Sequence, residues 1–335
     1  MNTDVLPPSP NIDAIRLSAA SLAPHVDRTP VIEWTGDRAH KVSGLDATLV
    51  FKLELMQRTG SFKARGAVAS VMALSAPERA RGVTAISAGN HAIAVAYAAR
   101  VLGTSAKVVM LQSANPARVA AVRALGAELL MASDGMTGFQ MVDDIAREEE
   151  RTFIHPFEGE TLVTATGTIG LELDAQSEPL DACIVALGGG GLGAGIAASL
   201  KQLQPDCQMI GVEPEGADVV HQSFARGAPV SGVTNNTIAD SLAPPMTEPY
   251  TLGVCRRYFD ALVKVDDVAM CRGMVDLYTE LKLVTEPAGA AAYAAATGPL
   301  QQALAGKRVG IIVCGGNIDV ESFAAHLRTG GHAPT

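Results

Sequence analysis

The segment GGGGLGAG, residues 188–195, is the strongest chemical signal in the sequence. The apolar stretch DACIVALG (181–188) comes directly before it and predicts a buried strand, and an apolar helical pattern follows. Because glycines lack Cβ atoms, their consecutive backbone N–H groups can turn toward one anion, and a helix N-terminus adds the positive end of its dipole. This arrangement predicts a phosphate-binding loop.

Two known kinds of phosphate site have related glycine patterns. A dinucleotide-binding loop needs an acidic residue about 20 residues further on for the ribose. Glu213 has that spacing, at the end of the predicted strand CQMIGVE (207–213). A P-loop requires Gly-Lys followed by Ser or Thr, and no such triplet follows the glycines. The spacing therefore leaves a dinucleotide cofactor open and excludes a P-loop.

One lysine has surroundings that suit covalent chemistry. Lys63 lies in TGSFKARGA (59–67), just before an apolar helical pattern for which Ser61 is the expected cap. The positive end of the helix dipole and desolvation by small neighbours both disfavour the ammonium form and lower the pKa of the amine. Such an amine can attack an aldehyde and can later act as a base.

Three further loops place polar groups beside predicted strands and helices. SAGNHA (87–92) lies between a strand and a helix and offers donors suited to a carboxylate or a ring hydroxyl. TEPAGAA (285–291) puts Glu286 before a helix that begins at a proline, and CGGNID (314–319) follows the last core strand. Taken alone, Asn90 and Glu286 are also ordinary helix-capping residues.

Seven motifs in this order resemble the fold-type-II pyridoxal-phosphate enzymes: SFKARGA, SAGNHA, GGGGLGAG, GVEPEGAD, TIADSL, TEPAGAA and CGGNID. The nearest branch is that of the threonine/serine dehydratases and serine racemases, and the resemblance covers about residues 11–328. It favours pyridoxal phosphate over NAD, because an aldehyde cofactor requires the lysine of SFKARGA whereas a dinucleotide does not.

The resemblance implies a role for each residue of the cofactor site. Lys63 would form the Schiff base with the cofactor and would later remove the α-proton of the substrate. Phe62 would lie against the cofactor ring, and Asn90 would bond its 3-hydroxyl group. Cys314 would lie near the pyridine nitrogen, and Glu286 would also belong to this site. The phosphate would be held by Gly188, Gly189, Gly190, Gly191 and Leu192.

The resemblance also implies where the substrate binds. Thr166 would lie near the substrate, in a segment TATGT (164–168) that replaces the AGQGT of the family. This departure favours a β-hydroxy acid bulkier than threonine, such as phenylserine or hydroxyaspartate. The substrate carboxylate would be held by the loop of Ser87, Ala88, Gly89, Asn90 and His91.

The implied function is that of a dehydratase, or ammonia-lyase, which converts an L-β-hydroxy-α-amino acid into a 2-oxo acid and ammonia. A neutral Cys314 thiol near the pyridine nitrogen would favour this direct elimination. A racemase of the serine racemase type is the alternative, but Ala88 stands where racemases have the serine that serves the opposite face of the substrate. More distant alternatives are an NAD-dependent dehydrogenase and a non-catalytic cofactor-binding protein.

Enzymes of this branch often bind a divalent cation after a Val-Glu-Pro strand end. Glu213 and Ala217 match two of the ligand positions. Val219 replaces the second acid, and Asp218 falls one residue early. Because hard cations need several oxygens in a fixed geometry, we expect no metal site.

The composition sets limits on the class of protein. The chain has 335 residues, 48% of them hydrophobic and 18% charged, with a net charge of −9. It can build a large core in two lobes, and it lacks the basic stripe of a nucleic-acid-binding protein. No apolar run reaches transmembrane length, and five widely spaced cysteines indicate free thiols. We expect a cytoplasmic homo-oligomer, a dimer or tetramer, without nucleic-acid or membrane partners.

Alternating strand and helix patterns predict an α/β fold with two open, twisted, mostly parallel sheets and flanking helices. The predicted larger domain, residues 1–60 and 157–335, binds the cofactor, and residues 61–156 form a smaller inserted domain that carries the carboxylate loop. Residues 1–10 are predicted to be a disordered lead-in and 228–250 a loop. The expected strands are 47–55, 82–87, 106–111, 127–131, 152–155, 181–188, 207–213 and 308–316. The expected helices are 11–23, 62–75, 92–103, 115–126, 137–150, 166–175, 192–204, 249–259, 267–282, 288–304 and 319–328.

Overall fold

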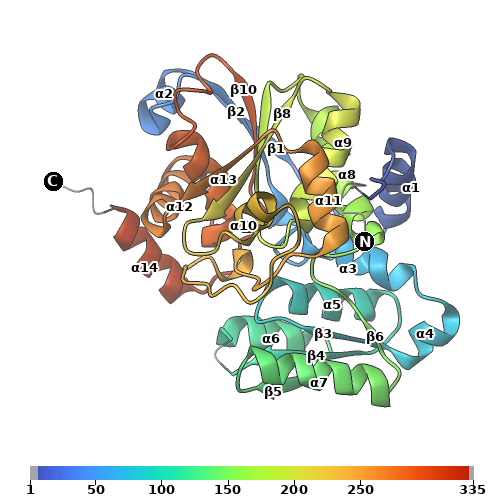
Figure 1. Ribbon diagram of the computed structural model, residues 1–335. Helices are drawn as coiled ribbons and strands as arrows, with labels where there is room; N and C mark the ends of the chain where they lie inside the picture. The colour runs from blue at the N-terminus through green and yellow to red at the C-terminus, as the bar shows by residue number, and fades with distance from the viewer. Residues whose placement is uncertain (1–6, 113, 332–335) are drawn as a thin grey trace.

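A computed structural model describes residues 7–112 and 114–331 of the chain. Figure 1 shows two lobes, each built on its own sheet with helices packed against it. The predicted α/β class with two mostly parallel sheets is confirmed. Over the described ranges, the helices lack the combination of length and apolar character that crossing a bilayer requires.

The larger sheet has six strands in the order β1-β2-β10-β7-β8-β9. Strand β1 pairs antiparallel with β2, and the other neighbours are parallel. The central strands are buried on both faces, which explains their continuous apolar sequences. The strands are β1 (Val31–Trp34), β2 (Thr48–Lys52), β7 (Ala182–Ala186), β8 (Gln208–Pro214), β9 (Ala261–Val265) and β10 (Arg308–Ile312).

The smaller sheet is wholly parallel, in the order β5-β4-β3-β6. Helices α5 and α6 cover one face, and α7 covers the other (Figure 1). The carboxyl ends of its strands therefore meet at one edge, from which the first turns of these helices begin. The elements are β3 (Val83–Ile86), α5 (Asn90–Val101), β4 (Ala106–Leu111), α6 (Pro116–Ala124), β5 (Glu128–Ala132), α7 (Gly135–Glu148) and β6 (Thr152–Phe153).

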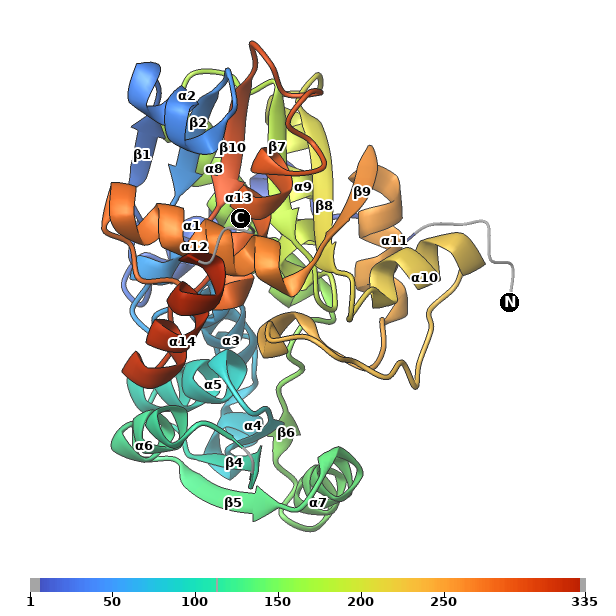
Figure 2. The same cartoon turned by 90° about the vertical axis from the view of Figure 1, so that its left-hand side faces the viewer.

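The remaining helices belong to the larger lobe or to its junction with the smaller one. Helix α8 packs along α9, and α12 packs against both α13 and α14 (Figure 2). The helices are α1 (Ile12–Leu22), α2 (Asp37–Ser43), α3 (Lys63–Met72), α4 (Ala76–Arg81), α8 (Glu160–Gln176), α9 (Gly191–Leu203), α10 (Val219–Arg226), α11 (Pro249–Tyr258), α12 (Asp267–Leu281), α13 (Pro287–Thr297) and α14 (Val320–Gly331), with short 3-10 helices at Glu54–Met56 and Asp240–Leu242.

Most predicted elements are present, and the exceptions have local causes. The elements β1, α2, α4, α10 and β9 were not predicted, because each has eight residues or fewer and carries little periodic signal. Helix α8 begins at Glu160 and not at 166, and Thr164 lies inside it with its hydroxyl donating to the Glu160 carbonyl at 2.7 Å. The domain boundaries near 60 and 156 stay a prediction, although β3 to β6 all lie between them.

Two predictions near the chain start and near Lys63 need correction. Of the expected disordered lead-in, residues 1–6 lie outside the described residues, but Ser9 bonds the Tyr258 hydroxyl at 2.6 Å. Ser61 does not cap α3, because it forms a β-bridge with Gly315 and its buried hydroxyl has no partner. The cap position is taken by Phe62, without a side-chain hydrogen bond.

A buried charge cluster holds α3 in place. The Arg65 guanidinium donates to Glu54 Oε1 at 2.8 Å and to Glu172 Oε1 at 2.6 Å. Lys52 Nζ also bonds Glu172, at 2.6 Å. Because Glu54 follows β2 and Glu172 lies on α8, the cluster ties the first turns of α3 to two parts of the larger lobe.

Candidate cofactor and substrate site

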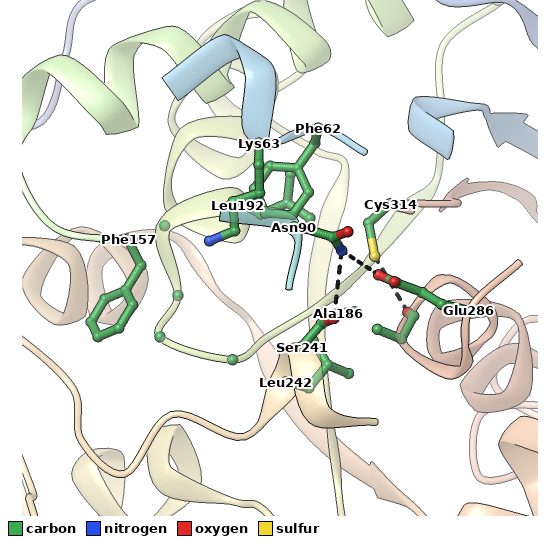
Figure 3. Close-up of a pocket in the computed structure, with 15 residues that line it drawn as sticks. Phe62, Lys63, Asn90, Phe157, Ala186, Leu192, Ser241, Leu242, Glu286 and Cys314 are labelled. Atoms are coloured by element: carbon green, nitrogen blue, oxygen red, sulfur yellow. Dashed lines mark hydrogen bonds between the residues drawn. The ribbon is translucent and has the colours of Figure 1, made fainter. Parts of the chain in front are cut away.

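A cavity lies at the start of α9, between the two lobes, and is lined by residues of both. All ten residues predicted for the cofactor site line it, and Figure 3 shows the Lys63 amine directed toward the glycine loop. Sequence reasoning did not predict five further lining residues, namely Phe157, Ala186, Ser241, Leu242 and Ala288.

The glycine loop joins β7 to α9 and has room only for glycine. Gly190 has φ of +88°, which side chains rarely adopt. A Cβ on Gly189 would lie 2.2 Å from Phe157 Cγ, and one on Gly188 would lie 3.2 Å from Leu242 Cα. The loop is thus enclosed by Phe157 and Leu242. Since the first N–H groups of a helix have no partners within the helix, the loop and the start of α9 present donors suited to a phosphate.

Lys63 is the first residue of α3, and its amine is buried. Nζ donates to the Pro156 carbonyl and lies 5.1 Å from the centroid of the Phe62 ring. Burial lowers the pKa of Lys63 to about 8, although Cys314 and Glu286 act in the opposite direction. A useful fraction of the amine is therefore uncharged near neutral pH, as the sequence predicted.

The opposite side of the cavity carries a thiol and a carboxyl group. Cys314 Sγ donates to the Ala288 carbonyl at 3.4 Å, and burial raises the pKa of the thiol, which keeps it neutral. Burial also raises the pKa of Glu286 to about 7, against the lowering effect of Arg118. On this side of the cavity the thiol is therefore neutral, and the Glu286 carboxyl is only partly ionised near neutral pH.

Asn90 is fixed by its neighbours. Its Nδ2 donates to Glu286 Oε1 at 2.7 Å and approaches Ser241 Oγ at 3.5 Å (Figure 3). Its Oδ1 accepts from Asn317 Nδ2 at 2.7 Å. Because these partners come from separate loops of the larger lobe, Asn90 joins the start of α5 to that lobe.

The rest of the predicted carboxylate loop lies beside the cavity and outside its lining. Ser87 Oγ accepts from the Gly89 N–H at 3.1 Å, and Ala88 packs on the core of the smaller lobe. His91 Nε2 lies 2.8 Å from the Ile154 carbonyl, which requires the proton on this nitrogen. Burial and then the Lys63 charge lower the pKa of His91 to about 3, so the ring is neutral.

Thr166 is not brought to the cavity surface. It is buried in α8, and its hydroxyl donates to the Gly191 carbonyl at 2.8 Å. A Cβ on Gly195 would lie 2.2 Å from this hydroxyl. The residue therefore supports the start of α9 from behind, and its predicted place near the substrate stays a prediction.

Arg118, on α6 of the smaller lobe, was missed by sequence reasoning. Its guanidinium donates to the Asp240 carboxylate, to Glu286 Oε2 at 3.4 Å and to the Asn317 carbonyl at 3.1 Å. These three partners belong to the larger lobe, so Arg118 bridges the lobes next to the cavity. The available signal was a cation in a first helical turn, where the dipole disfavours it.

A second missed feature is the loop after β6. His155 Nδ1 accepts the N–H groups of Phe157 and Glu158, at 3.3 and 2.9 Å. Its ring meets Phe157 edge-on, with centroids 4.7 Å apart. Burial, with a smaller effect of Lys63, lowers the pKa of His155 to about 4. A neutral imidazole thus holds Phe157 over the glycine loop.

The carboxylate of Glu213, considered as a cation ligand, already has partners. It is buried and accepts the N–H groups of Val220 and His221, both at 2.8 Å, and lies 2.5 Å from His221 Nδ1. Asp218 pairs with Lys264 at 2.6 Å. Across residues 7–112 and 114–331, no three His, Cys, Asp or Glu side chains gather as metal ligands.

Comparison with known proteins identifies the family. Residues 22–315 match the family model described as "Pyridoxal-phosphate dependent enzyme". The chain therefore belongs to this family, and pyridoxal 5'-phosphate is its cofactor.

Three relatives illustrate the similarity. The chain is 50% identical to phenylserine dehydratase of Ralstonia pickettii, over 96% of the chain and 97% of that protein. It is 35% identical to L-threo-3-hydroxyaspartate ammonia-lyase of Saccharomyces cerevisiae, over 93% of the chain and 94% of that protein. The structure of maize serine racemase superposes with a TM-score of 0.88 at 35% identity, covering 97% of this chain and all of the other.

The residues of the cavity fit this cofactor. The uncharged fraction of the Lys63 amine suits its aldehyde, and the glycine loop, into which no Cβ fits, suits its phosphate. Asn90 offers a fixed amide to the ring hydroxyl, and Cys314 offers a neutral group to the ring nitrogen.

The partners of Glu213 predict that the protein needs no divalent cation. Treatment with a chelator should leave both activity and melting temperature unchanged, because the carboxylate is already satisfied by His221 and backbone donors. A loss on chelation that Mg²⁺ or Ca²⁺ restores would contradict this expectation.

The buried neutral histidines predict sensitivity to acid. The folded pKa of His91, about 3, lies below the value of about 6.5 for an unfolded histidine. As the pH falls through 6.5, the unfolded chain takes up the proton first, so stability is lost. Between pH 7.5 and 5, His91 should cost about 2 kcal/mol in free energy of unfolding.

Denaturant unfolding at the two pH values measures this effect as a difference between variants. His91→Asn should reduce the acid-induced loss of stability by about that amount. Glu286 changes the stability in the opposite direction, but it does so in both proteins, so its contribution cancels when the two losses are subtracted. His40→Asn, at the surface, is the control. An equal loss in the original protein and in His91→Asn would contradict the assignment of a neutral ring.

Proposed function

We propose that the protein is a dehydratase of L-β-hydroxy-α-amino acids and that phenylserine is its substrate. The observation that carries the proposal is the buried Lys63 amine, with its lowered pKa, facing a phosphate-binding glycine loop in one cavity. The choice of phenylserine rests on the 50% identity to phenylserine dehydratase of Ralstonia pickettii.

The residues of the chain have distinct parts in this reaction. When bound, pyridoxal phosphate supplies an aldehyde for the substrate amine and withdraws electrons from the α-carbon. Lys63 removes the α-proton, and the N–H groups at the start of α5 bind the substrate carboxylate. Loss of the α-proton and of the β-hydroxyl leaves an enamine, which tautomerises and hydrolyses to the 2-oxo acid and ammonia.

Two features favour elimination over other reactions of the same cofactor. The neutral Cys314 thiol does not protonate the ring nitrogen, which limits how far the α-carbanion is stabilised and favours prompt loss of the hydroxyl. Ala88 has no proton to donate to the face opposite Lys63, so racemisation lacks its second acid.

The proposal extends to location and assembly. The five cysteines are free and buried, which supports a reducing cytoplasm. A homo-oligomer, a dimer or tetramer, stays a prediction, which size-exclusion chromatography with light scattering tests.

Turnover of phenylserine is the direct test. The purified holoenzyme should release phenylpyruvate and ammonia in equal amounts. Lys63→Ala should reduce the rate by about a thousandfold or more and abolish the visible absorption of the lysine-bound cofactor, with an unchanged far-UV circular dichroism spectrum. Lys41→Ala, at the surface, is the matched control. Full activity of Lys63→Ala would overturn the assignment.

The choice between lyase and racemase depends on Ala88. Given L-serine, the protein should form pyruvate and ammonia with little D-serine, and Ala88→Ser should raise the proportion of D-serine because it supplies a hydroxyl. Chiral chromatography of the remaining serine, beside a 2-oxo acid assay, measures both products, and Ala88→Gly is the control. D-serine formation as fast as pyruvate formation in the unaltered protein would refute this explanation.

A further inference from the structure

Two large apolar side chains in the first turns of α7 have no role in the site described above. Met136 is 83% exposed and Phe139 is 41% exposed, and they lie three positions apart on the same helix. Neighbouring exposed positions of α7 are polar, and its core-facing residues Val142 and Ile145 are buried. Exposed apolar side chains grouped in this way often mark a binding surface.

The position of α7 places this pair at the ligand-binding edge of the smaller sheet. Asp134 caps the helix directly after β5, at the carboxyl end of that strand. Ile86 ends the parallel strand β3, immediately before the carboxylate loop. Helix α7 packs on β3 at Gly138, because a Cβ added to this glycine would lie 2.6 Å from Ile86 Cδ1. Ligands of parallel α/β sheets bind at this edge.

The helical arrangement directs Phe139 toward the cavity side of the lobe. Gly138, Val142 and Ile145 face the sheet, and the next residue after Gly138 is turned by about 100°. The crossover from β5 through α7 to β6 is right-handed. For a helix in that position, the rotation of about 100° from Gly138 to the next residue puts Phe139 on the flank of α7 nearest β6. Figure 2 shows α7 below β6, whose chain continues into the loop of Phe157.

We propose that Phe139 and Met136 form a subsite for the phenyl ring of an aromatic β-hydroxy amino acid. The proposal rests on the proposed function and names the residues that select its substrate. The ring would lie between α7 and the loop of Phe157, where aromatic contacts are available on both sides. Its carboxylate would remain at the neighbouring start of α5.

The charges of this surface favour an aromatic ring over a second carboxylate. From Gly135 to Gln140, α7 carries no charged residue, and its cap residue Asp134 carries a carboxylate. A substrate with an acidic side chain, such as hydroxyaspartate, would meet a negative charge and two apolar groups. The methyl group of threonine offers much less apolar surface to this pair than a phenyl ring does.

Substrate selectivity measures the contribution of the subsite. In Phe139→Ala, kcat/KM for phenylserine should fall about tenfold, the range expected for loss of an apolar contact, while kcat/KM for threonine should change less than twofold. Met136→Ala should have a smaller effect in the same direction, and Phe139→Tyr should retain selectivity. Leu17→Ala, 71% exposed on α1, is the matched control and should change neither value. Equal changes for both substrates in Phe139→Ala would overturn the proposal.

A binding measurement separates this proposal from the proposed function. L-Phenylalanine has the same ring but no β-hydroxyl group, so it binds without elimination, and titration of the cofactor absorption gives its Kd. Phe139→Ala should raise the Kd of L-phenylalanine about tenfold and leave the Kd of L-alanine unchanged. If the unaltered protein turned over no β-hydroxy amino acid, the proposed function would fail, while selective loss of L-phenylalanine binding would still support the subsite. Unchanged binding of L-phenylalanine would refute it.

Discussion

The buried ion pairs of Arg65 are the interaction on which the rest of the site depends. The guanidinium is 1% exposed and joins Glu54, after β2, to Glu172 on α8. Removing one partner of such a pair leaves an uncompensated buried charge and costs about 3–5 kcal/mol. Because Arg65 lies two residues after Lys63, the same contacts fix the point from which the Lys63 amine enters the cavity.

Around that amine, burial controls the charge of each ionisable group. It lowers the pKa of Lys63, His91 and His155, and it raises that of Glu286 and Cys314. Burial thus shifts every one of these groups toward its neutral form, and a bound phosphate meets backbone dipoles in a low-dielectric setting where these act strongly. The same burial supplies Lys63 with an uncharged fraction that can act as nucleophile and base.

The two lobes meet through polar contacts beside the cavity. Asn90 and Arg118, both on helices of the smaller lobe, converge on Glu286 and Asn317 of the larger one. Inter-lobe surfaces of this polar kind permit relative motion of the two lobes. Asn90 belongs to the carboxylate loop, so the contacts that join the lobes also fix the position of that loop.

The sequence by itself determined the local chemistry. Four consecutive glycines and a lysine at a helix start specify a phosphate loop and a reactive amine, because the necessary backbone freedom and side-chain type are written in adjacent residues. Tertiary structure decided the rest. Ser61 looked like a cap but pairs with Gly315, and Arg118 looked like one more helical arginine. Their roles depend on partners more than 150 residues away, at Gly315, Glu286 and Asn317, and no local pattern encodes contacts that form only when separate strands and lobes pack together.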